Sequence, residues 1–397
     1  MPQSQDYSRF ESGDRGLGEP RTHRHDSFLI SSTAKRWLRN YWQPYRGFTS
    51  DGVVHPVWQA KPSANGPTRD MVQAAHKLLA VATNHEKKRF RYLVTAREWR
   101  AWSDPDVMVI DSGIRVEEMR EATQNAISDL LQATLAPEGL AKIRFALASR
   151  SSADDDVDMD FDDIFSEQST SYKFCLFGEP SMEAPWGFNL FGRNVCLNAF
   201  TLNGELIVGP FSVNVGAQDV SRGSQLLKRA EVAGLTLMRS LSLEQQARAS
   251  LQYTIDDLDG TSFVRTVGGA HQDNGVLPYR GICASEMNDL QIEVLLEAVR
   301  SFNESLPESA LNTFMTRVVE HLDETYFAWS GLVAEDSPYY FRVHSPVVLD
   351  ELEHQETESL SQYRIVATQR LPNRGDYGAA LLDEWIRNTH AKVRKSN

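Results

Sequence analysis

Residues 184–216 constrain the fold more than any other segment, because they combine a long apolar run with a strong turn signal. Side chains alternate along residues 188–200 in the manner of a β-strand. The dipeptide Asn203-Gly204 is typical of a two-residue hairpin turn, and residues 205–211 return as the second strand. Since both alternating sets are largely apolar, we expect an antiparallel hairpin buried on both faces near the centre of a sheet.

Three polar side chains interrupt this apolar run. They are Arg193, Asn194 and Asn198. A polar group buried in a sheet must either be hydrogen-bonded or serve a ligand. The three are therefore the first candidates for a functional site, and the alternative is a structural hydrogen-bond network.

The rest of the chain alternates between blocks of helices and blocks of strands. Apolar periodicity predicts helices over residues 68–79, 116–133, 221–250, 288–302, 309–322 and 378–392. Returning strands are expected over residues 326–331, 339–351 and 363–371. Because strands and helices do not alternate strictly, the pattern predicts an α+β fold, with a largely antiparallel sheet covered by helices.

Domain organisation follows from composition along the chain. Residues 1–30 have the composition of a disordered arm, and residues 31–397 are predicted to form a single large domain. Within it, residues 33–60 carry a dense aromatic cluster that must fold back onto the body or onto a partner. Residues 152–170 are expected to be an acidic surface loop; a calcium loop is the alternative, but Phe161 stands where such a loop needs glycine.

Composition excludes several classes of partner. The net charge of -13 argues against nucleic acid and anionic membranes, which both require clustered Lys and Arg. Three widely spaced cysteines, Cys175, Cys196 and Cys283, match neither a disulfide framework nor a zinc cluster. No apolar run has the length of a signal peptide core or a membrane span. The sequence thus predicts a cytoplasmic protein with no membrane contact, and it does not fix the oligomeric state.

Several motifs resemble one known family. They are "PWGFNLFGRNVCLNAF", "WSDP", "LPYRGICASEMNDLQ", "YFAWSG", "PYYFRVHSPVVLDELEHQ" and "RLPNRGDYG", and they span about residues 70–390. In order and spacing they are similar to the domain-of-unknown-function family number 3500. The family label carries no activity, so the resemblance implies a shared fold and pocket rather than a reaction.

The chain departs from the family pattern at two places. The family has Gly-His-His where this chain has Gly-Arg-Asn at residues 192–194, and His-Ile-His where it has Arg-Ile-Val at residues 364–366. The resemblance implies that two such histidine pairs and a nearby carboxylate would form a metal site. Arginine cannot ligate a metal. If this chain is nevertheless metal-dependent, the remaining ligands are His344, Glu351, His354 and Asp376.

The retained motifs suggest a pocket that has changed its chemistry. Arg193 and Asn194 can orient or polarise a carbonyl group, and His344 can act as acid or base, although it could also be a satisfied core histidine. Arg342 lies two positions before His344 in a strand, so both side chains face the same side. The expected substrate-binding residues are Trp186, Phe188, Asn198, Tyr279, Trp329, Tyr340, Arg342 and Arg364.

These observations favour a small-molecule enzyme of specialised metabolism. It would bind an apolar substrate in an aromatic-lined pocket and promote cyclisation, cycloaddition or isomerisation without metal or cofactor, mainly through orientation. One alternative is an iron- or zinc-dependent enzyme of oxidative or hydrolytic chemistry. Another is a catalytically inactive binding or scaffold member of the family, with residues 33–60 as its interface.

Overall fold

The fold was analysed in a computed structural model of the chain. The structure describes residues 26–61, 68–103, 110–148, 172–192, 194–216, 220–251, 266–334, 337–356 and 363–396. The predicted arm therefore lies outside the described residues up to position 25, and the predicted acidic loop lies wholly outside them.

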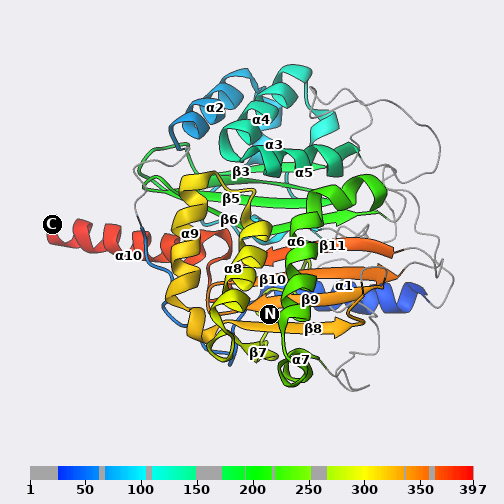
Figure 1. Ribbon diagram of the computed structural model, residues 1–397. Coiled ribbons are helices and arrows are strands. Elements are labelled where there is room, and N and C mark those ends of the chain that lie inside the picture. Colours follow the sequence, from blue (N-terminus) through cyan, green and yellow to red (C-terminus); the bar gives the residue numbers. More distant parts are fainter. Residues whose placement is uncertain are drawn as a thin grey trace.

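One large sheet forms the centre of the molecule (Figure 1). Within the described residues, eleven strands join it in the order β1-β3-β4-β5-β6-β11-β10-β9-β8-β7, with β2 paired to β3. All pairings are antiparallel except that of β1 with β3. The strands are β1 (Arg91–Tyr92), β2 (Ile114–Arg115), β3 (Lys173–Phe177), β4 (Trp186–Phe191), β5 (Val195–Leu202), β6 (Glu205–Val215), β7 (Ile282–Cys283), β8 (Tyr326–Gly331), β9 (Tyr339–His344), β10 (Leu349–Glu356) and β11 (Tyr363–Arg370).

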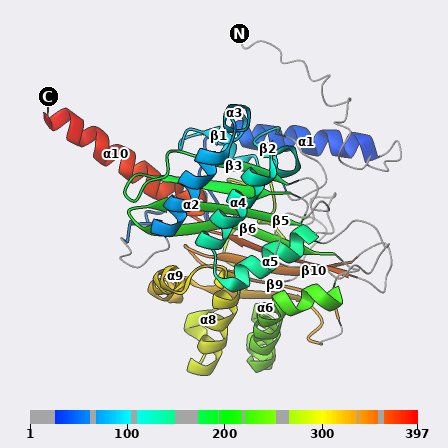
Figure 2. The same ribbon diagram turned by 90° about the horizontal axis from the view of Figure 1, so that it is seen from above.

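Helices cover the sheet on both sides. The helices α6, α8 and α9 lie on one face and α1 lies on the opposite side, whereas the C-terminal half of α10 projects from the body (Figure 2). The helices are α1 (Asp26–Trp42), α2 (Thr68–Val81), α3 (Asn84–Phe90), α4 (Glu121–Thr134), α5 (Pro137–Ala148), α6 (Val220–Ser240), α7 (Leu243–Ala249), α8 (Asp289–Asn303), α9 (Glu308–Glu320) and α10 (Ala379–Ser396). The predicted α+β class, with a largely antiparallel sheet under helices, is confirmed.

The central segment forms three strands where the sequence predicted two. The apolar run is interrupted: β4 ends at Phe191 and β5 begins at Val195, and the two strands pair antiparallel with Phe191 opposite Cys196. Asn203 and Gly204, with φ of 51° and 79°, then form the predicted turn between β5 and β6. Every side chain of β4 and β5 is buried, as expected for the centre of the sheet.

Other boundaries differ for local reasons. The predicted helix over residues 221–250 is two helices, because Ser242 caps α7 and its hydroxyl accepts a hydrogen bond from the Gln245 backbone N–H. The predicted strand over residues 339–351 is also two, β9 and β10, joined by a turn in which the Val348 backbone N–H donates to the Ser345 hydroxyl. The first helix begins at Asp26, inside the predicted arm.

The two faces of the sheet differ in chemistry. Toward α6 and α8 the strands present core residues such as Phe341, which packs edge-on against Phe302 of α8. The other face, here called the polar face, is lined in register by Ser212, Arg342, His344, Glu351, Glu353, Thr368 and Arg370. Among the described residues, no helix has the length and apolar character needed to cross a bilayer.

Candidate functional site

A stretch of irregular chain, the cover segment (residues 266–280), lies over part of the polar face. Glu351 of β10 holds it there: one carboxylate oxygen accepts hydrogen bonds from the Tyr340 hydroxyl at 2.6 Å and the Val267 backbone N–H at 3.0 Å. The other oxygen accepts from the Gly268 N–H at 2.7 Å. Burial raises the pKa of Glu351, although these three donors and the positive charge of Arg342 act in the opposite direction. Both carboxylate oxygens of Glu351 therefore accept hydrogen bonds inside the protein.

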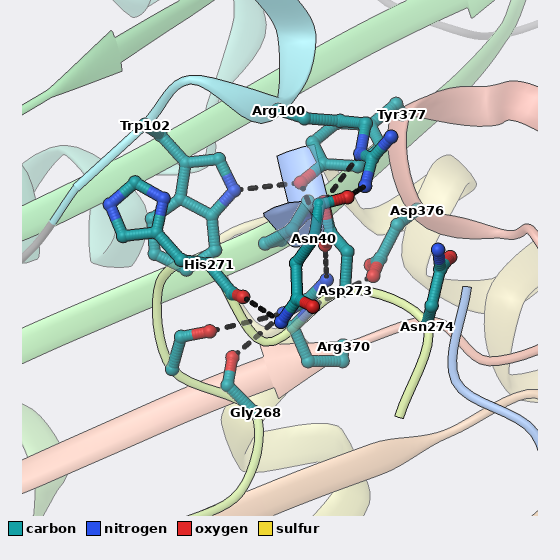
Figure 3. A network of polar contacts seen from close by, with 12 residues as sticks. Asn40, Arg100, Trp102, Gly268, His271, Asp273, Asn274, Arg370, Asp376 and Tyr377 are labelled. Atoms are coloured by element: carbon teal, nitrogen blue, oxygen red, sulfur yellow. Dashed lines mark hydrogen bonds and ion pairs between the residues drawn. The ribbon is translucent and has the colours of Figure 1, made fainter. Parts of the chain in front are cut away.

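Next to this contact lies a buried network of charges (Figure 3). The guanidinium of Arg370, fully buried on β11, bonds Asp376 at 2.7 Å, Asp273 at 2.5 Å and the Gly268 carbonyl at 2.9 Å. Arg100 bonds the second oxygen of Asp273 at 2.8 Å. Burial opposes ionisation of Asp273, but Arg370 and Arg100 outweigh it and hold the pKa of this carboxyl below its usual range.

The backbone around the network is held in unusual conformations. His271, Asn274 and Tyr377 have positive φ angles of 61°, 69° and 62°. The Tyr377 hydroxyl accepts a hydrogen bond from the Trp102 indole at 2.7 Å and donates one to Asp273 at 3.3 Å. Residues that are not glycine adopt such angles only where their surroundings impose them. The network thus fixes the cover segment, β11 and the chain after β11 in one arrangement.

Arg342, on β9, is buried on the same face but has no such partners. Only 4% of its surface is exposed, and its Nε lacks a hydrogen-bond partner. Among the residues that the structure describes, none forms a hydrogen bond or an ion pair with it. In register, Ala328 of β8 lies on one side of Arg342 and Glu351 on the other. A buried guanidinium that no described residue bonds is costly to the folded protein.

His344 follows two positions later on the same face. It is 1% exposed, and its Nδ1 has no hydrogen-bond partner. Burial lowers the pKa of His344 to about 3, and the positive charge of Arg342 adds to the effect. At neutral pH the ring is therefore an uncharged imidazole that can accept a proton.

Two aromatic rings flank the imidazole. The Tyr279 ring of the cover segment lies 4.6 Å from the His344 ring and stacks on the Tyr326 ring at 5.1 Å, with an interplanar angle of 3°. Tyr326 of β8 is the register partner of His344. A neutral base, a cation without a hydrogen bond or ion pair to the described residues, and a stacked aromatic pair thus lie together. We call Arg342, His344, Tyr340, Glu351 and Tyr279 the β9 site.

Four residues of the β9 site were predicted as catalytic or substrate-binding, and other predicted residues lie elsewhere. Arg193 is outside the described residues. The side chain of Asn194 donates to the Ala146 carbonyl of α5 at 3.3 Å, and that of Asn198 donates to the Pro210 carbonyl at 3.1 Å. Arg364 is exposed and bonds Gln355 at 2.5 Å. In the described residues, Asn194, Asn198 and Arg364 therefore show structural contacts.

Three predicted pocket aromatics belong to the core. The Trp186 indole donates to the Ser181 carbonyl at 2.8 Å, and Phe188 stacks on Phe174 at 5.9 Å. Trp329 stacks on Tyr339 at 4.5 Å, on the helix-covered face of the sheet. None of the three lies on the same face of the sheet as His344.

The residues proposed as alternative metal ligands do not meet. His344 and Glu351 lie on the polar face, whereas His354 points to the opposite face and bonds Glu231 of α6 at 2.8 Å. Asp376 is engaged by Arg370 in the charge network. Among the described residues, no group of three or more His, Cys, Asp or Glu side chains is arranged to hold a metal ion.

Sequence patterns did not reveal the residues that hold the cover segment. Arg100 and Asp273 are 173 positions apart, and no local periodicity connects residues so distant. The available signal was weaker: Arg100 lies among tryptophans, and Asp273 lies in a stretch without helix or strand pattern. Tyr326, the first residue of a correctly predicted strand, was also not singled out.

Comparison with known proteins identifies the family of the chain. No curated protein matches it, and no solved structure does. A family model described as "Protein of unknown function (DUF3500)" matches residues 64–379 of the 397 residues. The match includes β4 to β6, the cover segment and the whole β9 site. The chain therefore belongs to the DUF3500 family.

Proposed function

We propose that the protein is a small-molecule enzyme that performs a cofactor-independent isomerisation or cyclisation. The observation that carries the proposal is His344, a buried imidazole whose Nδ1 has no hydrogen-bond partner among the described residues. On the same face of β9 lies Arg342, a cation with no hydrogen bond or ion pair to a described residue. General bases are commonly histidines, and charge developing on a substrate needs a fixed counter-charge. We further propose that the substrate is an apolar small molecule and that the protein is a cytoplasmic enzyme of specialised metabolism.

The reaction begins with a proton transfer next to a carbonyl group. The imidazole of His344 accepts the proton from carbon, and the C–H electron pair becomes a carbon–carbon double bond. The carbonyl electron pair moves onto oxygen, where the guanidinium of Arg342 stabilises the negative charge. Return of the proton to another carbon gives an isomer, and attack of the enolate carbon on an electrophile in the same molecule gives a ring.

The neighbouring groups have supporting roles. The Tyr340 hydroxyl donates a hydrogen bond to Glu351 at 2.6 Å, which fixes these two side chains on the same face as Arg342. Tyr279 and Tyr326 provide a flat apolar surface beside the imidazole. This aromatic surface holds a flexible substrate in a reactive conformation, which increases the rate through orientation.

Deuterium exchange tests the proposed reaction. The protein is incubated in D2O with a panel of ketones and keto acids, and deuterium at the acidic carbon is followed by NMR. We expect the protein to accelerate exchange for at least one probe and His344→Gln to reduce that rate by about 100-fold or more. The matched control is His390→Gln, which changes an exposed histidine of α10. No acceleration by the unaltered protein, or an undiminished rate in His344→Gln, would refute the proposal.

A further inference from the structure

Arg342 forms no hydrogen bond or ion pair with a described residue, although its charge acts on Glu351 and lowers the pKa of that carboxyl. Glu351 is the acidic residue opposite it in register, yet both carboxylate oxygens of Glu351 are engaged by Tyr340 and the cover segment. No ion pair forms between Glu351 and Arg342 in the described structure. A transient enolate would compensate the cation only during the reaction. A negative charge present on the substrate from the start would compensate it throughout the catalytic cycle.

On the basis of the proposed function, we infer that the otherwise apolar substrate is a keto acid whose carboxylate binds the guanidinium of Arg342. The planar guanidinium matches a carboxylate through two parallel hydrogen bonds. Arg342 and His344 are two positions apart on one strand, so their backbones are separated by roughly 7 Å. This spacing places the acidic carbon within a few bonds of the carboxylate, as in 2-oxo and 3-oxo acids.

The aromatic pair defines the other end of the substrate. Tyr279 and Tyr326 stack in parallel, and Tyr279 contacts the imidazole directly. Aromatic rings favour flat or conjugated groups packed against them. A substituent of that kind on the acidic carbon would also make its proton easier to remove, because the enolate would be conjugated with it.

Binding of a carboxylate would also activate the base. In the ligand-free protein, burial is the main cause of the low pKa of His344, and the charge of Arg342 is the second cause. A carboxylate on Arg342 removes the second cause and places a negative charge near the imidazole, so the pKa rises toward neutrality. Proton transfer is most efficient when the pKa of the base is close to the ambient pH. Binding of the substrate would therefore make His344 a stronger base.

Phenylpyruvate and its methyl ester provide a matched pair of probes, because they differ in the carboxylate charge. In D2O, His344 removes a proton from C3, the electron pair forms the C2–C3 double bond, and a solvent deuteron returns to C3. We expect the protein to exchange the acid at least about 10-fold faster than the ester, relative to the reactions without protein. Arg342→Gln should abolish this preference, and Arg387→Gln, a change of an exposed arginine on α10, should retain it.

The outcomes separate this inference from the proposed function. Equal acceleration of acid and ester by the unaltered protein would overturn the keto-acid inference and leave the proposed reaction standing. If neither probe exchanges, the inference is tested by the binding of phenylpyruvate. Binding is detected as a change in the pKa of His344, measured by NMR titration of its ring. An upward shift of the His344 pKa that is absent in Arg342→Gln would support the carboxylate site without the reaction. The absence of any shift in the unaltered protein would refute the inference.

Discussion

Arg342 and Arg370 lie on the same face of one sheet, two strands apart, and both are buried. Arg370 bonds two carboxylates and a backbone carbonyl, and its positive charge also lies 4.9 Å from the centre of the Phe48 ring. Arg342 has no hydrogen bond or ion pair with any residue in the described part of the chain. Two buried arginines on one face thus differ: the guanidinium of Arg370 is fully paired, and that of Arg342 has no hydrogen bond or ion pair with a described residue.

The difference is the basis for proposing a structural role for Arg370 and a substrate-binding role for Arg342. A buried ion that is fully paired holds distant segments together, and removal of one partner leaves the others uncompensated. A buried ion that lacks a partner destabilises the free protein, and under the proposed function a substrate supplies the opposite charge at Arg342. The two arginines should therefore respond to substitution with opposite signs.

The largest expected effect is at Arg370. Arg370→Met would leave Asp273 and Asp376 buried without their main cation, because Arg370 bonds both. We expect a loss of about 3–5 kcal/mol in the free energy of unfolding, measured with urea. Arg387→Met, at an exposed position on α10, is the control and should change stability little. A loss below about 1 kcal/mol at Arg370 would mean that the network does not hold the fold.

The next effect concerns His344 and pH. Because the folded pKa of about 3 is lower than the ordinary 6.5, the unfolded chain binds the proton first. Stability from this group is therefore complete above pH about 6.5 and decreases as the pH falls toward 3. The unaltered protein should lose about 2–3 kcal/mol more than His344→Gln between pH 7 and 4.5. Parallel stability curves for the two proteins would show that the imidazole is not buried uncharged.

The smallest effect has the opposite sign. Arg342→Met removes a cation that no described residue compensates and keeps an apolar side chain of similar length. We expect the free energy of unfolding to increase by about 1–2 kcal/mol, together with a decrease in the rate of the exchange proposed above. Urea unfolding of the ligand-free protein measures the change. Destabilisation comparable to that of Arg370→Met would place Arg342 among the structural ions and remove the distinction between the two.

Local patterns predicted most of the fold. Apolar periodicity located α2, α8 and α9 within a few residues, and the turn at Asn203 and Gly204 was identified from two letters. The break between β4 and β5 was missed, because the run was read as one alternating strand, whereas Phe191 and Cys196 lie opposite each other on the same face. Periodicity describes which side of an element is buried, but it does not report how far one strand continues.

The β9 site was predictable only in part. Arg342 and His344 were placed on one face by their two-residue spacing, which register pairing confirms. The contrast between Arg342 and Arg370 was not predictable. Arg370 is paired by Asp273, which lies in a segment without regular structure. Contacts of this kind are set by tertiary packing, and a single sequence contains no pattern that reports them.

The charge network also affects the order in which parts of the chain fold. Asp273 connects Arg100 and Arg370, so the cover segment is secured only after the first hundred residues and the last strand of the sheet have met. Hairpins such as β9–β10 can form from neighbouring residues, but contacts between distant residues form late because closing long loops is entropically costly. During synthesis, the chain would therefore carry Arg342 and His344 in an open sheet until β11 leaves the ribosome. The β9 site would be among the last parts of the protein to close.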